Sequence, residues 1–179
     1  FPEDERWEII DGVPYNMVPA PGTKHQSILL NLALVLGNAL RSHQCKPFIS
    51  PTDVVLSEEN VVEPDLFVIC DQTKITEKCI RGAPDVVFEI TSPSSSKKDR
   101  LLKRRLYERF GVKEYVLVDS DNLCVERFLL DENDRYRVSE IFDSSQTLTL
   151  KSLEGVDIPL GEVFITGAEE QEAKESEVR

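Results

Sequence analysis

Residues 85–118 constrain the fold most, because they change from strand to helix and back within one short stretch. The segment "DVVFEIT" at 85–91 is apolar apart from its acids, which is typical of a strand buried on both faces of a sheet. Pro93 ends this strand, and the serines after it can cap a helix expected over 97–110. Gly111 follows as a helix-stopping glycine, and "EYVLV" predicts a return strand. The sequence therefore predicts a β-α-β unit with parallel strands.

Further strands and a second helix are expected around this unit. Asp11-Gly12 lies between two short alternating segments and predicts an N-terminal hairpin. Leucines at helical spacing predict an amphipathic helix from His25 to about Ser42. The other expected elements are strands at 46–57, 61–70, 123–130, 135–141 and 146–151 and a short piece near 159–164. The pattern indicates an α+β fold with an α/β core, in which helices flank a mixed central sheet.

Length and charge suggest how the chain is organised. We expect a single domain over 1–166 and an acidic tail over 167–179, either a frayed helix or disordered. The net charge of −12 argues against broad nonspecific affinity for nucleic acid. From Lys97 to Lys113, however, eight basic residues stand against two acidic ones, a local charge of +6. No apolar run approaches the length of a membrane span, so we expect a cytoplasmic protein without membrane partners.

The four cysteines show no zinc-site spacing. They stand at positions 45, 70, 79 and 124, and none forms a C-x-x-C pair. Two disulfides are arithmetically possible, but three of the four cysteines lie in or beside apolar runs. Buried, reduced thiols are therefore the expectation.

Two acidic residues in apolar strands indicate a metal-binding site. Glu89 interrupts one apolar run, and Asp65 lies in another. A buried carboxylate needs a compensating partner, and two of them suit Mg²⁺ (or Mn²⁺), which takes oxygen ligands from carboxylates, water and phosphate. Lys103, on the following helix, can border the same sheet edge and neutralise charge developing on a phosphate. Asp, Glu and Lys together are the residue types that metal-assisted phosphodiester hydrolysis uses.

Each of these residues also has a structural alternative. Asp65 can mark a strand end after a proline, and Glu89 can pair with an arginine of the helix. Lys103 can form a helical ion pair with Asp99. His25 can hydrogen-bond backbone groups at a helix start, an interpretation that we favour over a catalytic base. The basic run can be a solvated helix face.

Four segments of the chain together carry a family resemblance: "WEIIDGV", "VVEPDLFVI", "GAPDVVFEITSPSSSKKDRLLKRRLYERFGVKEYVLVD" and "LEGVDIPLGEVF". With these segments the chain resembles the Uma-two family, a bacterial domain of unknown function in the restriction-endonuclease-like PD-(D/E)XK superfamily. The resemblance implies a restriction-endonuclease-like fold in which Asp65, Glu89 and the backbone carbonyl of Ile90 hold the metal. The superfamily's lysine two residues after the Glu is Thr91 here. The resemblance assigns that role to Lys103.

Two classes of function follow. The first is a Mg²⁺-dependent endonuclease that hydrolyses DNA, and the second is a non-catalytic binding or assembly module that retains the nuclease fold. A homodimer is expected. The accessory candidates are Glu8, His25 and Tyr107, and the candidate nucleic-acid-binding residues are Lys97, Lys98, Arg100 and Arg104.

Overall fold

The computed structural model describes residues 6–17, 20–91 and 97–165, without the side chains of 97–99 and 137–139. Its larger sheet has six strands in the order β11-β10-β9-β8-β6-β3. The bounds are β3 Lys46–Ile49, β6 Leu66–Ile69, β8 Val86–Thr91, β9 Glu114–Asp119, β10 Cys124–Leu130 and β11 Tyr136–Asp143. Strands β8 and β9 pair in parallel and the other neighbours are antiparallel, so the sheet is mixed. The predicted α+β class is confirmed.

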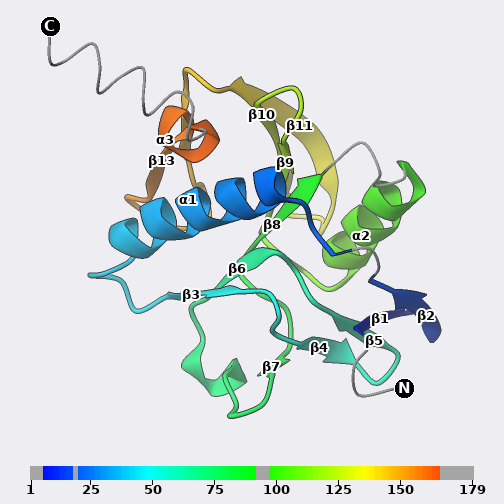
Figure 1. The fold of residues 1–179 in the computed structure, drawn as a ribbon. Coiled ribbons are helices and arrows are strands. Elements are labelled where there is room, and N and C mark those ends of the chain that lie inside the picture. Colours follow the sequence, from blue (N-terminus) through cyan, green and yellow to red (C-terminus); the bar gives the residue numbers. More distant parts are fainter. Residues whose placement is uncertain (1–5, 18–19, 92–96, 166–179) are drawn as a thin grey trace, which may run out of the picture.

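The predicted β-α-β unit is present at nearly the expected bounds. Helix α2, Lys97–Arg109, connects β8 to β9, and Gly111 follows it with a φ of 77°. A positive φ is strained for a residue with a Cβ, which explains a glycine at this helix end. All six residues of β8 are buried, because α1 and α2 cover opposite faces of the sheet (Figure 1).

The two faces of the large sheet hold two separate cores. Helix α1, Thr23–Ala39, packs with α3, Leu160–Phe164, and with the hairpin of β12, Thr147–Thr149, and β13, Asp157–Pro159. Phe88 and Val116 belong to that core, whereas Val87 and Tyr115 belong to the core under α2. Because successive strand residues point to opposite faces, Glu89 must point to the α2 face together with Val87.

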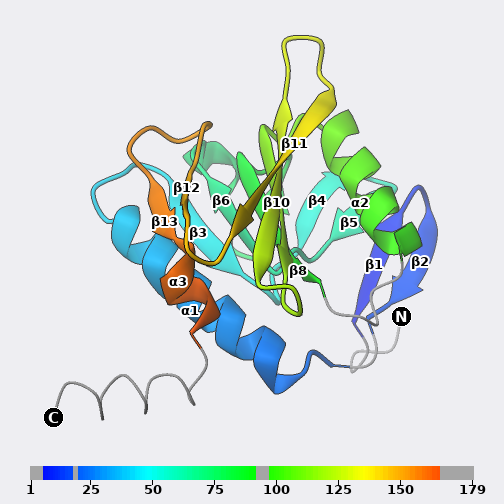
Figure 2. The same cartoon turned by 90° about the horizontal axis from the view of Figure 1, so that it is seen from above.

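A smaller five-stranded sheet adjoins the α2 side. Its order is β2-β1-β5-β4-β7, with bounds β1 Trp7–Ile10, β2 Val13–Asn16, β4 Val54–Ser57, β5 Asn60–Val62 and β7 Ile80–Arg81. Asp11 and Gly12 connect β1 to β2 with φ angles of 52° and 74°, as the sequence predicts for a tight hairpin. Figure 2 shows this hairpin beside α2, on the opposite side of the molecule from α3.

Two strand predictions differ from the structure. The expected strand at 46–57 divides into β3 and β4, and the one at 61–70 divides into β5 and β6. Both divide because the chain passes between the two sheets at these points, and Pro64 lies at the second crossing. The piece near 159–164 is the helix α3. No helix in the described residues is both long and apolar enough to cross a membrane.

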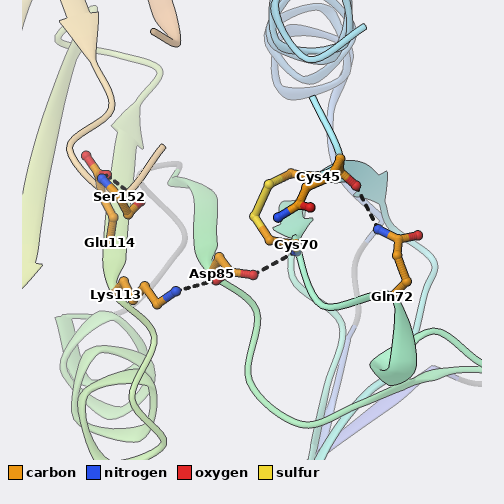
Figure 3. The surroundings of a disulfide bond; sticks show 8 residues. Cys45, Cys70, Gln72, Asp85, Lys113, Glu114 and Ser152 are labelled. Carbon is orange, nitrogen blue, oxygen red and sulfur yellow. Dashed lines mark hydrogen bonds and ion pairs between the residues drawn. A yellow bond between two sulfur atoms is a disulfide. The ribbon is translucent and has the colours of Figure 1, made fainter. Parts of the chain in front are cut away.

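The prediction of four reduced thiols is wrong. Cys45 and Cys70 form a disulfide (Figure 3). Cys79 and Cys124 are free. Lys46 pairs with Ile69, so the two cysteines face each other one step beyond the end of the β3–β6 ladder. The sequence alone does not show this neighbourhood, because it depends on which strands pair.

Candidate functional site

The Glu89 carboxylate is the centre of the candidate site. Its Oε1 accepts a hydrogen bond from the Tyr107 hydroxyl at 2.8 Å and lies 3.0 Å from the Lys103 ammonium nitrogen. Both partners come from α2, four residues apart, so they lie one above the other on the same helix face. The alternative that Glu89 pairs with an arginine of α2 is wrong, because its partner is Lys103.

The Lys103 side chain points into the protein. It is 17% exposed, and its Nζ lies between two carboxylates, 3.0 Å from Glu89 Oε1 and 2.9 Å from Glu8 Oε1. It is therefore not the solvated lysine of a surface ion pair, although the Asp99 side chain lies outside the described residues. The Lys103 ammonium reaches Glu89 from helix α2. This is the geometry expected if Lys103 takes the place of the strand lysine, because that position is Thr91 in this chain.

Glu8 comes from the hairpin and joins the two sheets. It is 6% exposed, and its Oε1 also accepts a hydrogen bond from the Glu63 backbone N–H at 3.0 Å. Glu63 lies two residues before Asp65, on the passage from β5 to β6. Glu8, Asp65, Glu89 and Lys103 are hereafter the carboxylate cluster.

Asp65 directly precedes β6 and lies beside Glu89. Leu66 pairs with Phe88, so one further step of the same register sets Asp65 opposite Glu89. Its Oδ2 accepts a hydrogen bond from the Ile90 N–H at 2.8 Å and lies 3.1 Å from His25 Nε2. The favoured interpretation of His25, hydrogen bonding to backbone groups, is wrong. No local signal could have shown this contact, because 40 residues separate the pair.

The carboxylate cluster contains three acidic side chains and one basic side chain, and it is largely shielded from solvent. Burial raises the pKa of Glu89 to about 7, and Asp65 and Glu8 add to this by charge repulsion, while Lys103 acts in the opposite direction. Burial lowers the pKa of Lys103, but Glu89 and Glu8 more than offset it, so the pKa lies well above its usual value. Lys103 is therefore charged, and one ammonium faces three carboxyl groups.

The donor set fits a hard divalent cation. Asp65 and Glu89 supply carboxylate oxygens, and Mg²⁺ commonly takes one or two protein carboxylates and completes its shell with water and phosphate. The described residues contain no group of three or more His, Cys, Asp or Glu side chains arranged to hold a metal ion. A fully protein-built metal cage is thus absent from this part of the chain. An excess of buried negative charge is what a cation would relieve.

Of the four predicted nucleic-acid-binding residues, the structure describes the side chains of Arg100 and Arg104. Arg104 stacks over the Phe128 ring at 4.5 Å and donates to the Tyr136 carbonyl, so it packs against the sheet. Arg100 lies 4.0 Å from Glu126. The side chains of Lys97 and Lys98 lie outside the described residues. The metal-binding roles, including that of the Ile90 carbonyl, stay predictions.

Comparison with known proteins shows the family and the fold of the chain. The chain is 27% identical over 152 residues to the uncharacterized protein slr1290 of Synechocystis sp., covering 83% of this chain and 78% of that protein. It superposes on the crystal structure of a "putative nuclease belonging to DUF820" from Anabaena variabilis with a TM-score of 0.73 and 19% identity, over 88% of this chain and 89% of the other. That likeness shows the restriction-endonuclease-like fold. The family model Uma2, described as "Putative restriction endonuclease", matches residues 1–161, and the chain therefore belongs to the Uma2 family.

Proposed function

We propose that the protein is a metal-dependent endonuclease that hydrolyses DNA phosphodiester bonds with Mg²⁺ or Mn²⁺. One observation carries the proposal: Glu89 is a buried carboxyl with a pKa raised to about 7, next to Asp65 and beneath the Lys103 ammonium. A hydrophobic core that serves packing alone does not require a buried carboxyl group. Membership of a family described as restriction endonucleases supports the same chemistry.

Each residue of the cluster has a role in this proposal. Asp65 and Glu89 would hold the cation, which when bound supplies Lewis acidity toward a phosphate oxygen and an attacking water. Lys103 places a positive charge where the phosphate gains negative charge in the transition state. Two neighbours orient the carboxylates: Tyr107 donates to Glu89, and His25 contacts Asp65.

DNA is the substrate class that the charge distribution favours. Eight basic residues lie from Lys97 to Lys113, and Lys103 is one of them. Lysines and arginines neutralise phosphates and release counterions, which yields affinity that falls with salt. The expectations of a homodimer and of a cytoplasmic location stay predictions.

A non-catalytic module is the second candidate. The Lys103 ammonium already contacts both Glu8 and Glu89, so the cluster has an internal counter-ion without a metal. If the cluster is purely structural, its role is to connect α2, the hairpin and β8.

Cleavage of supercoiled plasmid DNA tests the first candidate. The parent protein is incubated with Mg²⁺ or Mn²⁺ and compared with Asp65→Asn and with a sample containing a chelator. We expect the parent to nick the plasmid when metal is present, and neither Asp65→Asn nor the chelator sample to do so. Glu162→Gln, which alters an exposed acid of α3, is the matched control and should cleave like the parent. Absence of both cleavage and calorimetric metal binding in the parent would favour the non-catalytic module.

A further inference from the structure

We propose that Glu8 is a positioning residue: it holds the Lys103 ammonium beside the site, so that Glu89 is free to bind a divalent cation. This inference rests on the proposed function. It assigns Glu8 a role through Lys103 rather than as a metal ligand.

The contacts of Glu8 support an anchoring role. Its Oε1 lies 2.9 Å from Lys103 Nζ and accepts the Glu63 backbone N–H at 3.0 Å. The backbone donor holds this oxygen in place independently of the lysine. Since the Glu8 side chain is only 8% exposed, water competes little with the ion pair.

The shared lysine is the reason that an anchor is needed. One ammonium contacts Glu89 and Glu8 at nearly equal distances, 3.0 and 2.9 Å. A divalent cation on Glu89 repels that ammonium and competes with it for the same oxygen. Glu8 keeps a carboxylate contact for the lysine when Glu89 takes the cation. Without Glu8, Glu89 is the one carboxylate of the cluster that Lys103 still contacts, and the cation must displace the lysine from it completely.

Through its contacts with Glu8 and Glu89, Lys103 connects the two sheets. Glu89 lies in β8 of the large sheet, while Glu8 lies in β1 of the small sheet. The lysine therefore has one partner that belongs to the metal site and one that belongs to the hairpin. The hairpin thus becomes part of the site through Lys103.

A double-mutant cycle measured by Mn²⁺ calorimetry tests the proposal. The proteins are the parent, Glu8→Gln, Lys103→Met and the double variant, all at pH 8. The amide oxygen introduced by Glu8→Gln can still accept the Glu63 N–H, so the local fold should persist, and thermal unfolding checks this. We expect Glu8→Gln to weaken Mn²⁺ binding about tenfold in the parent, the scale of coupling between contacting charges. In the Lys103→Met background the loss should shrink to about threefold or less, the part due to charge alone.

Each other outcome overturns the proposal. An equal or larger loss in the Lys103→Met background means that Glu8 binds the cation directly. No loss in either background means that Glu8 only joins the hairpin to α2. Failure of the parent itself to bind Mn²⁺ rejects the proposed function, which is a separate result. Glu63→Gln is the matched control, because it removes one carboxylate charge nearby that pairs with Arg6 and not with Lys103. It should change Mn²⁺ affinity by less than about twofold.

Discussion

The Glu89 carboxyl makes the stability of the metal-free protein depend on pH. Its pKa is raised from 4.5 to about 7, chiefly by burial. The unfolded chain releases this proton near pH 4.5, whereas the folded chain retains it until about pH 7. Between these values the unfolded state binds fewer protons, so the free energy of unfolding falls as the pH rises. Below pH 4.5 the group is protonated in both states, and above pH 7 the penalty is complete.

The size of this penalty follows from the two pKa values. A difference from 4.5 to about 7 corresponds to roughly 3 kcal/mol at full ionisation, of which about 2 to 3 kcal/mol is lost between pH 5 and pH 8. Glu89→Gln removes the ionisation and keeps an acceptor for Tyr107. The stability of this variant relative to the parent should therefore rise by that amount over the same range.

Urea unfolding followed by the fluorescence of Trp7, the single tryptophan, measures the difference. The solutions contain a chelator and have constant ionic strength at pH 5, 6, 7 and 8. Glu162→Gln is the control and should follow the parent at every pH. A difference between Glu89→Gln and the parent that is constant from pH 5 to pH 8 would refute the raised pKa.

The same titration predicts how metal binding depends on pH. A cation on Glu89 must displace the proton, and the ionised fraction falls from about nine-tenths at pH 8 to about one-tenth at pH 6 for a pKa of about 7. Mn²⁺ affinity should therefore fall about tenfold over that range. Calorimetry in which the affinity is flat from pH 6 to pH 8 would show that Glu89 is not a ligand or titrates elsewhere.

Three further predictions concern other parts of the structure. Reduction of the Cys45–Cys70 disulfide, or Cys45→Ser, should lower the free energy of unfolding by about 3 to 4 kcal/mol and Tm by about 10 °C, because the bond closes a loop with a sequence separation of 25. Cys79→Ser is the control and should leave Tm nearly unchanged. Four reactive thiols in the denatured, unreduced protein would contradict the disulfide. Lys103→Met should slow any DNA cleavage about 100-fold while the protein stays folded, and cleavage at the parent rate would reject its role in the transition state. Asp65→Asn removes a proposed metal ligand, so it should abolish Mn²⁺ binding. It also removes a charge that raises the pKa of Glu89, so it should stabilise the metal-free protein at pH 8. A lower Tm would indicate instead that Asp65 is a structural ion-pair partner.

The sequence by itself determined the elements whose signals are local. Hydrophobic periodicity and Gly111 predicted β8, α2 and β9 to within one or two residues, and Asp11-Gly12 predicted the hairpin. The placing of Glu89, Lys103 and Tyr107 was also accessible, because a strand and the helix that follows it must pack together. These signals act over a few residues along the chain, so no knowledge of distant neighbours is needed.

Only the tertiary structure decided the contacts between distant segments. Glu8 meets Lys103, His25 meets Asp65 across 40 residues, and Cys45 meets Cys70 across 25. Each contact depends on which strands pair, on their register and on where the chain passes from one sheet to the other. Strand pairing is set by the burial of both cores at once, and that is a property of the whole fold rather than of any local pattern.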